Sequence, residues 1–152
     1  MDWPRLRSVA NWVNLSTPCG LLVARAAGCR VVGGWNGLYF ALGYRPRLPV
    51  AGAFTIGNVI LFRPRFADPA AFPDLVAHEE RHGTQYALCL GLPFLAFYAV
   101  AAGYSWWRTG DPASRNVFER GAGLAAGGYI ERPVRPAADA LRGLRRWNPR
   151  RG

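Results

Sequence analysis

The sequence of 152 residues contains no lysine, only two histidines and only three cysteines. Cys19, Cys29 and Cys89 lie far apart, are odd in number and form no C-x-x-C pair. This pattern argues against a disulfide framework and against a metal site built from thiolates. We therefore expect reduced thiols that fill space in the core.

The N-terminal region also lacks the pattern of a secretory signal. Arg5 and Arg7 precede a partly apolar segment, but Asn11, Asn14 and Arg25 leave no clean apolar run followed by a cleavage site. We therefore expect a cytoplasmic location. Internal repeats, low-complexity segments and motifs that recognise DNA or RNA are absent as well, so no nucleic-acid partner is expected.

The charge is strongly one-sided. All nineteen basic residues are arginine, against nine acidic residues, which gives a formal net charge of +10. Such a charge fits either a solvated surface or attraction to an anionic partner. Six tryptophans favour an anionic membrane surface among those partners, because indole rings prefer the membrane interface. Peripheral membrane association therefore remains an alternative, and nothing in the sequence indicates an oligomeric state.

The length suits a single domain, residues 1–152, with a basic tail at about 142–152. The fold class that we predict is α+β, with a small antiparallel β-meander packed on a helical layer. Its strands are expected at residues 29–32, 37–44 and 51–62. Helices are expected from Thr17 to Gly28, at 75–91 after a cap at Asp74, at 93–107, at 113–128 after Asp111 and Pro112, and at about 136–147.

Both histidines lie in the segment "LVAHEERHGTQY", as His78 and His82. Residues four apart on a helix are neighbours on one face, so both imidazoles can bind one metal ion. Glu79 lies about 100° round the helix from His78, which leaves its carboxylate free to accept a proton from a water activated by the metal. The H-E-x-x-H pattern therefore predicts a metal site with a general base.

A plainer alternative is a charged surface helix on which Glu79 and Glu80 pair with Arg81 and the histidines. The two middle positions of such metal-binding helices are usually uncharged, and here they are Glu80 and Arg81. We expect those two side chains to point away from the site, toward solvent or a partner.

A hydrolytic zinc site needs a third protein ligand and an open position for water. With no further histidine, that ligand must be a carboxylate, and the downstream candidates are Asp111, Glu119, Glu131 and Asp139. Glu119 is favoured because the small residues Ala122, Gly123 and Ala126 would let its helix approach the histidine helix closely. The alternative for Glu119 is a surface carboxylate paired with Arg115 or Arg120.

With "HEERHGTQ" and a helical glutamate 37 residues after His82, the chain resembles the gluzincin branch of zinc metallopeptidases over about residues 50–128. The resemblance implies a zincin-like fold, Zn²⁺ bound by His78, His82 and Glu119, Glu79 as general base, and a peptide or protein substrate. The strand "AFTIGNVILF" is similar to the edge strand that lines the cleft in that fold. The gluzincin histidine that stabilises the oxyanion has no equivalent here, and Tyr129 is a candidate for its role. The layout from "NLSTP" through "TIGNVI" to H-E-x-x-H also resembles that of a group of small bacterial proteins, a likeness that implies no activity.

A membrane protein is the main competing interpretation. Residues 87–107 carry no charge and are long enough to span a bilayer, with Trp106, Trp107 and Arg108 as interfacial anchors. A single span would place His82 and Glu119 on opposite sides, whereas Gly91 and Pro93 favour a break that brings the chain back. Two other classes therefore stay open: a zinc or binding module without catalysis, and a membrane-associated interaction protein.

Overall fold

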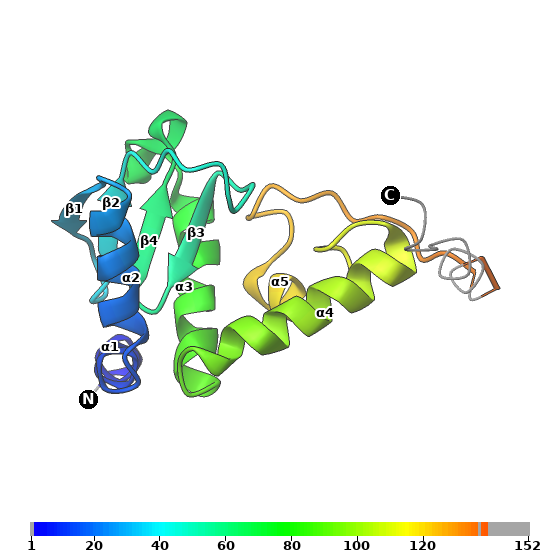
Figure 1. Ribbon diagram of the computed structural model, residues 1–152, viewed down its shortest axis with the longest axis horizontal. Coiled ribbons are helices and arrows are strands. Elements are labelled where there is room, and N and C mark those ends of the chain that lie inside the picture. Colours follow the sequence, from blue (N-terminus) through cyan, green and yellow to red (C-terminus); the bar gives the residue numbers. More distant parts are fainter. Residues whose placement is uncertain (1, 137, 140–152) are drawn as a thin grey trace.

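A computed structural model describes residues 2–136 and 138–139 of the chain. Within them, helices lie on both faces of a single four-stranded sheet, and the helices at 93–109 and 117–122 extend to one side of it (Figure 1). The α-helices are α1 (Trp3–Val13), α2 (Ser16–Ala26), α3 (Pro73–Leu88), α4 (Pro93–Thr109) and α5 (Val117–Ala122). The strands are β1 (Arg30–Gly33), β2 (Tyr39–Leu42), β3 (Ala53–Ile56) and β4 (Val59–Phe62), and short 3₁₀ helices lie at Pro64–Phe66 and Pro69–Ala71. The predicted mixture of helices and strands is confirmed.

The predicted antiparallel meander is wrong. The strand order is β1-β2-β4-β3, and β2 and β4 pair in parallel, while the two outer pairings are antiparallel. Residues 51–62 form a tight hairpin instead of one strand, because the chain reverses at Gly57 and Asn58. Gly57 has a φ of 63°, and a Cβ there would lie 2.4 Å from the backbone nitrogen of Thr17. Only glycine fits this turn.

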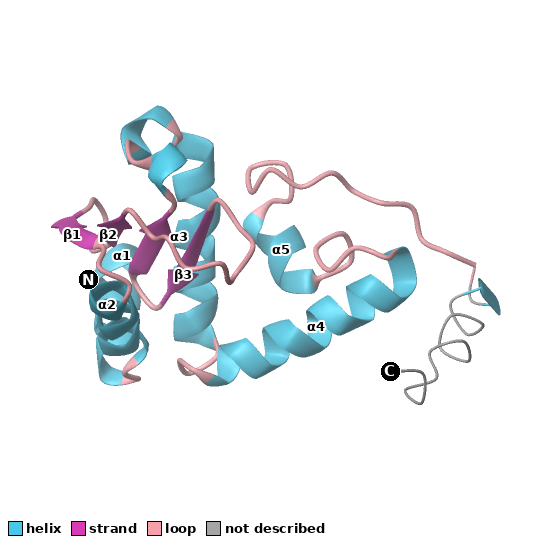
Figure 2. Cartoon of the chain, turned by 45° about the horizontal axis from the view of Figure 1, so that its top comes forward, coloured by secondary structure: helices cyan, strands magenta, loops and turns pink. Residues whose placement is uncertain are grey.

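The sheet is covered on both faces, which differs from the predicted single helical layer. All four residues of β4 are buried, and their side chains alternate between two apolar clusters. One cluster includes Val76 of α3, and the other includes Ala24 of α2. Figures 1 and 2 show α2 and α3 on either side of the sheet. The side chains on one face of β4 therefore pack against α3, the helix that carries both histidines, and hold it in place.

The long uncharged segment breaks where expected. Leu90 and Gly91 have φ values of 59° and 94°, and α4 begins at Pro93. The axes of α3 and α4 differ by 117°. Among the described residues no single helix is long and apolar enough to cross a membrane, although α3 and α4 together meet that criterion as a bent pair.

Several predicted helix ends differ from the structure. Phe72, and not Asp74, is the N-cap of α3, and Asp74 lies in the first turn, where its charge complements the helix dipole. Asp111 accepts hydrogen bonds from the backbone of the turn at residues 113–114, whereas Asn116 caps α5. The helix predicted at 113–128 is therefore reduced to α5. The helix predicted at about 136–147 and the tail at 142–152 lie largely or wholly outside the described residues.

Candidate metal centre

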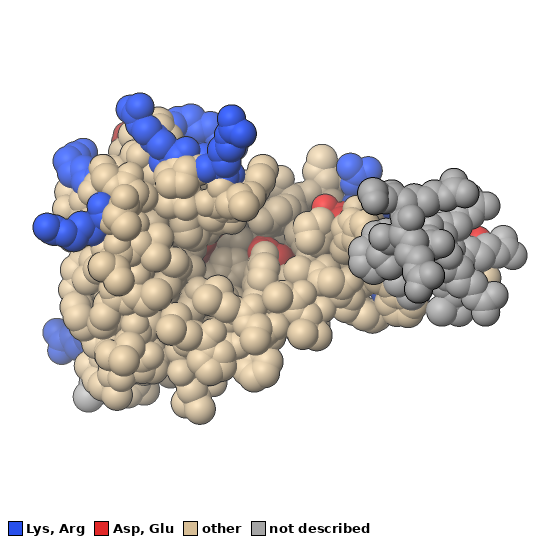
Figure 3. All heavy atoms as spheres, viewed as in Figure 1, with Lys and Arg blue, Asp and Glu red and all other residues tan. Residues whose placement is uncertain are grey.

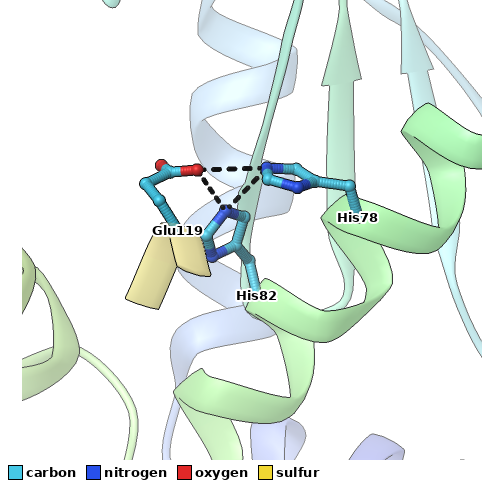
Figure 4. Close-up of side chains that lie close together, drawn as sticks. All are labelled: His78, His82 and Glu119. Atoms are coloured by element: carbon cyan, nitrogen blue, oxygen red, sulfur yellow. Dashed lines mark hydrogen bonds and ion pairs between the residues drawn. The ribbon is translucent and has the colours of Figure 1, made fainter. Parts of the chain in front are cut away.

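The two imidazoles of α3 converge, as the spacing of four residues requires. Both side chains are buried, and the Nε2 atoms of His78 and His82 lie 3.1 Å apart (Figure 4). Their rings are nearly perpendicular, at 86°. Each ring therefore directs the same nitrogen at a common point.

Glu119 reaches this point from α5. Its Oε2 atom lies 3.3 Å from Nε2 of His78 and 3.6 Å from Nε2 of His82 (Figure 4). The residue is 2% exposed, so the alternative of a surface carboxylate is wrong. Arg115 and Arg120 pair instead with Glu131. The candidate ligands Asp111, Glu131 and Asp139 lie outside the cluster of His78, His82 and Glu119.

The hydrogen-bond partners of the two Nδ1 atoms determine which nitrogen of each ring carries the proton. Nδ1 of His78 donates to the carbonyl oxygen of Gly123 at 3.0 Å, and Nδ1 of His82 donates to Oε1 of Gln85 at 2.7 Å. The amide orientation of Gln85 is itself set, because its nitrogen donates to the carbonyl of Phe118 at 2.8 Å. With the proton on Nδ1, each neutral ring presents an unprotonated Nε2 to the centre.

Three acceptor atoms thus face one another in a buried space. Oε2 of Glu119 has no hydrogen-bond donor besides the imidazoles, whose Nε2 atoms carry lone pairs in these tautomers. Such an arrangement is favourable when a proton or a metal ion lies between the three atoms. Tetrahedral ligands about 2.1 Å from an ion lie about 3.4 Å from one another, close to the observed 3.1, 3.3 and 3.6 Å. The residues therefore fit a metal ion, and this group could hold one.

Small residues allow the segment around α5 to approach the histidine helix. Ala122 is fully buried, and a Cβ on Gly127 would lie 2.5 Å from the ring of His78. The predicted close approach therefore occurs, and it includes Gly127, beyond the end of α5.

The two charged residues inside the motif turn toward partners on neighbouring helices and Arg81 is exposed, which agrees with the predicted orientation toward solvent or a partner. Glu80 accepts a 2.6 Å hydrogen bond from Arg7 of α1, whose side chain is 1% exposed. Arg81 donates to the carbonyl oxygen of Ala122 at the end of α5 at 2.7 Å. Both charges therefore hold neighbouring helices against α3, because a buried guanidinium and a free helix carbonyl each need a partner.

Glu79 is buried beside the histidines. The hydroxyl of Thr55, on β3, lies 2.7 Å from its Oε2. Burial raises the pKa of Glu79, an effect that the charges of His82 and His78 and the hydrogen bond from Thr55 only partly offset. A carboxylate with a raised pKa is a better proton acceptor than an exposed one.

Tyr98, on α4, belongs to the site and was missed in the sequence. Its phenol donates a short hydrogen bond to Oε1 of Glu119. Burial alone would raise the pKa of Glu119. Without a metal, imidazoles protonated on Nε2 donate hydrogen bonds to Glu119, and together with the charge of His82 and the hydrogen bond from Tyr98 they lower that pKa to about 2. Tyr98 lies 21 residues before Glu119, so no local sequence pattern links the two. Only the packing of α4 beside α5 brings them together.

Two cavities meet at Glu79, which lines both together with Ala51, Ala53 and Tyr129. One of about 190 Å³ is lined by both histidines, Glu79, Glu119 and mostly apolar side chains, and one of about 750 Å³ extends past Glu79 toward the loops before β3 and after β4. Tyr129 lines both cavities, and its ring centroid lies 6.1 Å from that of His78. Burial raises the pKa of Tyr129, so its hydroxyl stays protonated near neutral pH.

The fold and the site define a protein of mixed α and β structure with a buried His-His-Glu group able to hold a metal ion. In comparisons with family models, curated proteins and solved structures, the chain matches none of them.

Proposed function

We propose that the protein is a zinc-dependent metallopeptidase of the gluzincin kind, with His78, His82 and Glu119 as ligands. One observation carries the proposal: three buried acceptor atoms lie 3.1–3.6 Å apart with a buried carboxylate, Glu79, beside them. Two nitrogens and one oxygen are ligands typical of catalytic zinc, and three protein ligands leave one position open.

A zinc ion in this position would polarise both a water molecule and the substrate carbonyl. Glu79 would accept a proton from that water as the oxygen attacks the carbonyl carbon, and would then deliver the proton to the leaving amine as the C–N bond breaks. Thr55 orients the carboxylate for this transfer. The hydroxyl of Tyr129, which makes no hydrogen bond within the described residues, is available to donate to the developing oxyanion.

A peptide is the substrate class that the surroundings favour. In the part of the chain that the structure describes, β3 is an edge strand that pairs only with β4, and its residues Ala53, Phe54 and Thr55 line the smaller cavity. An extended peptide can add to such an edge through backbone hydrogen bonds. That position would bring a peptide bond next to Glu79.

Metal analysis of the purified chain tests the site. We expect one equivalent of zinc in the wild type and none in His78→Ala or Glu119→Ala. Glu131→Gln is the matched control, because Glu131 is an exposed carboxylate paired with Arg115 and Arg120. Full zinc content in Glu119→Ala would refute the assignment of the third ligand.

Turnover is tested separately, with a mixture of peptides and detection of new termini by mass spectrometry. The zinc-loaded wild type should cleave, and Glu79→Gln should bind zinc but lose cleavage by about two to four orders of magnitude. Zinc binding without cleavage by the wild type would instead indicate a zincin-like module without catalysis.

Association with a membrane surface is a second candidate, favoured by one apolar end of the molecule. Leu15, between α1 and α2, and Leu90, between α3 and α4, are 63% and 79% exposed. The two turns are adjacent, because a Cβ on Gly91 would lie 2.8 Å from the side chain of Asn14. Exposed apolar groups at neighbouring turns fit insertion into a lipid surface.

Flotation with vesicles of mixed neutral and anionic lipid tests this candidate. The wild type should float, and the double variant Leu15→Asn with Leu90→Asn should not. Asparagine suits both positions because it tolerates the left-handed backbone conformation found there. Equal flotation of the two proteins, or none of either, would exclude the candidate.

A further inference from the structure

We propose that the larger cavity binds an acidic side chain of the peptide, so that the enzyme selects substrates with a carboxylate on one side of the scissile bond. The inference rests on the proposed function and names its substrate class. It starts from the difference in charge between the two cavities that meet at Glu79.

Four arginines line the larger cavity: Arg45, Arg47, Arg63 and Arg65. Among the described residues Glu79 is the only acidic one in its lining, and it is buried. Within residues 2–136 and 138–139, none of the four arginines forms an ion pair. Figure 3 shows basic atoms gathered along one edge of the molecule, above a hollow with acidic atoms at its floor. Positive charge on this wall is therefore not neutralised by the protein.

The wall is held in place by Arg63. Its Nε donates to the carbonyl oxygen of Ala51 at 2.8 Å, and its Nη2 donates to those of Pro49 and Arg47 at 2.7 and 3.1 Å. These bonds fix the backbone of the loop between β2 and β3. They occupy most of the N–H donors of Arg63, which therefore has a structural role. Arg45, Arg47 and Arg65 keep their donors for a ligand, with Arg65 resting on the ring of Phe66.

The smaller cavity has the opposite character. Phe54, Phe94 and Leu95 line it together with the metal-binding group, and no arginine contributes. A peptide that runs through both cavities would place an apolar side chain in the smaller one and the residues beyond Glu79 against the arginines. Clefts lined by charge of one sign concentrate ligands of the opposite sign, and guanidinium groups bind carboxylates through paired hydrogen bonds. The arrangement therefore selects a leucine- or phenylalanine-containing peptide with aspartate or glutamate a few residues away.

Binding to the zinc-loaded Glu79→Gln protein tests this selection without any need for turnover. The probes are fluorescent octapeptides, amidated at the C-terminus, that contain one leucine and either two glutamates or two glutamines on one side of it. A third probe carries glutamines and a free C-terminal carboxylate, which separates recognition of side chains from recognition of a chain end. We expect the glutamate peptide to bind about tenfold more tightly than the amidated glutamine peptide at low salt, with the advantage shrinking as salt rises.

The double variant Arg45→Gln with Arg47→Gln, in the same background, should bring the two amidated peptides to within about twofold of each other. Arg25→Gln with Arg30→Gln removes the same charge from exposed positions on α2 and β1 and should leave the preference intact. Three results would overturn the inference. They are equal binding of the glutamate and glutamine peptides, equal loss of the glutamate preference in both double variants, and a preference only for the free C-terminal carboxylate. A glutamate preference that depends on Arg45 and Arg47 supports it even where the wild type cleaves nothing, and in that case only the proposed hydrolysis fails.

Discussion

The phenol of Tyr98 donates a hydrogen bond to Oε1 of Glu119, while Oε2 of the same carboxylate faces the two imidazoles. One oxygen is thus held by α4 so that the other can bind a metal. Each histidine is oriented in the same way, by a contact on the nitrogen that faces away from the centre. Outer contacts of this kind set the direction of every proposed ligand.

Tyr98→Phe removes the hydrogen bond to Glu119 and leaves the ring. We expect zinc affinity to fall about tenfold or more, because the carboxylate loses its fixed orientation. Competition against a chelator of known affinity measures the change. Tyr104→Phe, at a half-exposed position on the same helix, should have no effect, and unaltered affinity in Tyr98→Phe would show that the contact does not position the ligand.

Gly127→Ala adds a Cβ that would lie 2.5–2.9 Å from three ring atoms of His78. The imidazole must shift, so we expect at least a tenfold loss of zinc affinity, with unfolding free energy lowered by about 1–3 kcal/mol. Gly103→Ala is the control, since nothing lies within 4 Å of its Cβ. It should leave zinc affinity alone and stabilise α4 by up to about 1 kcal/mol. Similar behaviour of the two variants would contradict the close contact.

The gain in stability from zinc should depend on pH. Burial lowers the pKa of His82, but the hydrogen bond to Glu119 and the charges of Glu79 and Glu119 outweigh it, so the pKa is raised above its ordinary value of 6.5. In the metal-free protein, protonated His82 therefore stabilises the fold below pH 6.5, and this contribution disappears as pH rises through the raised pKa. Zinc competes with the same proton.

The rise in Tm caused by zinc should therefore be small at about pH 5.5 and grow as pH increases through and above the pKa of His82. Thermal unfolding with zinc and with a chelator, across this pH range, measures it. His82→Asn should abolish both the zinc effect and this pH dependence. A zinc effect that stays constant with pH would place the metal away from His82.

Leu90→Gly should raise stability although it removes a large apolar side chain. Leu90 has a φ of 59° and is 79% exposed. A left-handed conformation costs a leucine about 1–2 kcal/mol, of which part is offset by the greater freedom of glycine in the unfolded chain. We expect a gain of about 0.5–1 kcal/mol in chemical denaturation. Leu22→Gly, at a 68% exposed position inside α2, should instead lose about 1 kcal/mol. A loss in both variants would show that Leu90 is not strained.

Much of the candidate site could be predicted because it depends on local geometry. A spacing of four residues on a helix brings His78 and His82 together in any fold that forms the helix. The burial of Glu119 was expected from the small residues that follow it, but this expectation needed the two helices to pack together. The break in residues 87–107 was also local, since Gly91 and Pro93 end one helix and begin another.

Other features could not be predicted in this way. Glu80 and Arg81 were expected to point toward solvent or a partner, but nothing local indicates which partners they have, because Arg7 and the end of α5 lie far away in the sequence. The parallel pairing of β2 with β4 depends on how the loop at residues 43–52 crosses the sheet, and strand composition contains no information about that path.

The sequence by itself determined the helix that holds both histidines, the break at Gly91 and Pro93 and the excess of positive charge. These follow from helical periodicity, backbone sterics and composition, which act over a few residues or over the chain as a whole. Only the tertiary structure decided that Glu119 and Tyr98 meet those histidines and that four arginines line one wall of the adjoining cavity. Such meetings depend on packing between segments distant in the chain, where many arrangements satisfy the same local preferences and the buried core selects one.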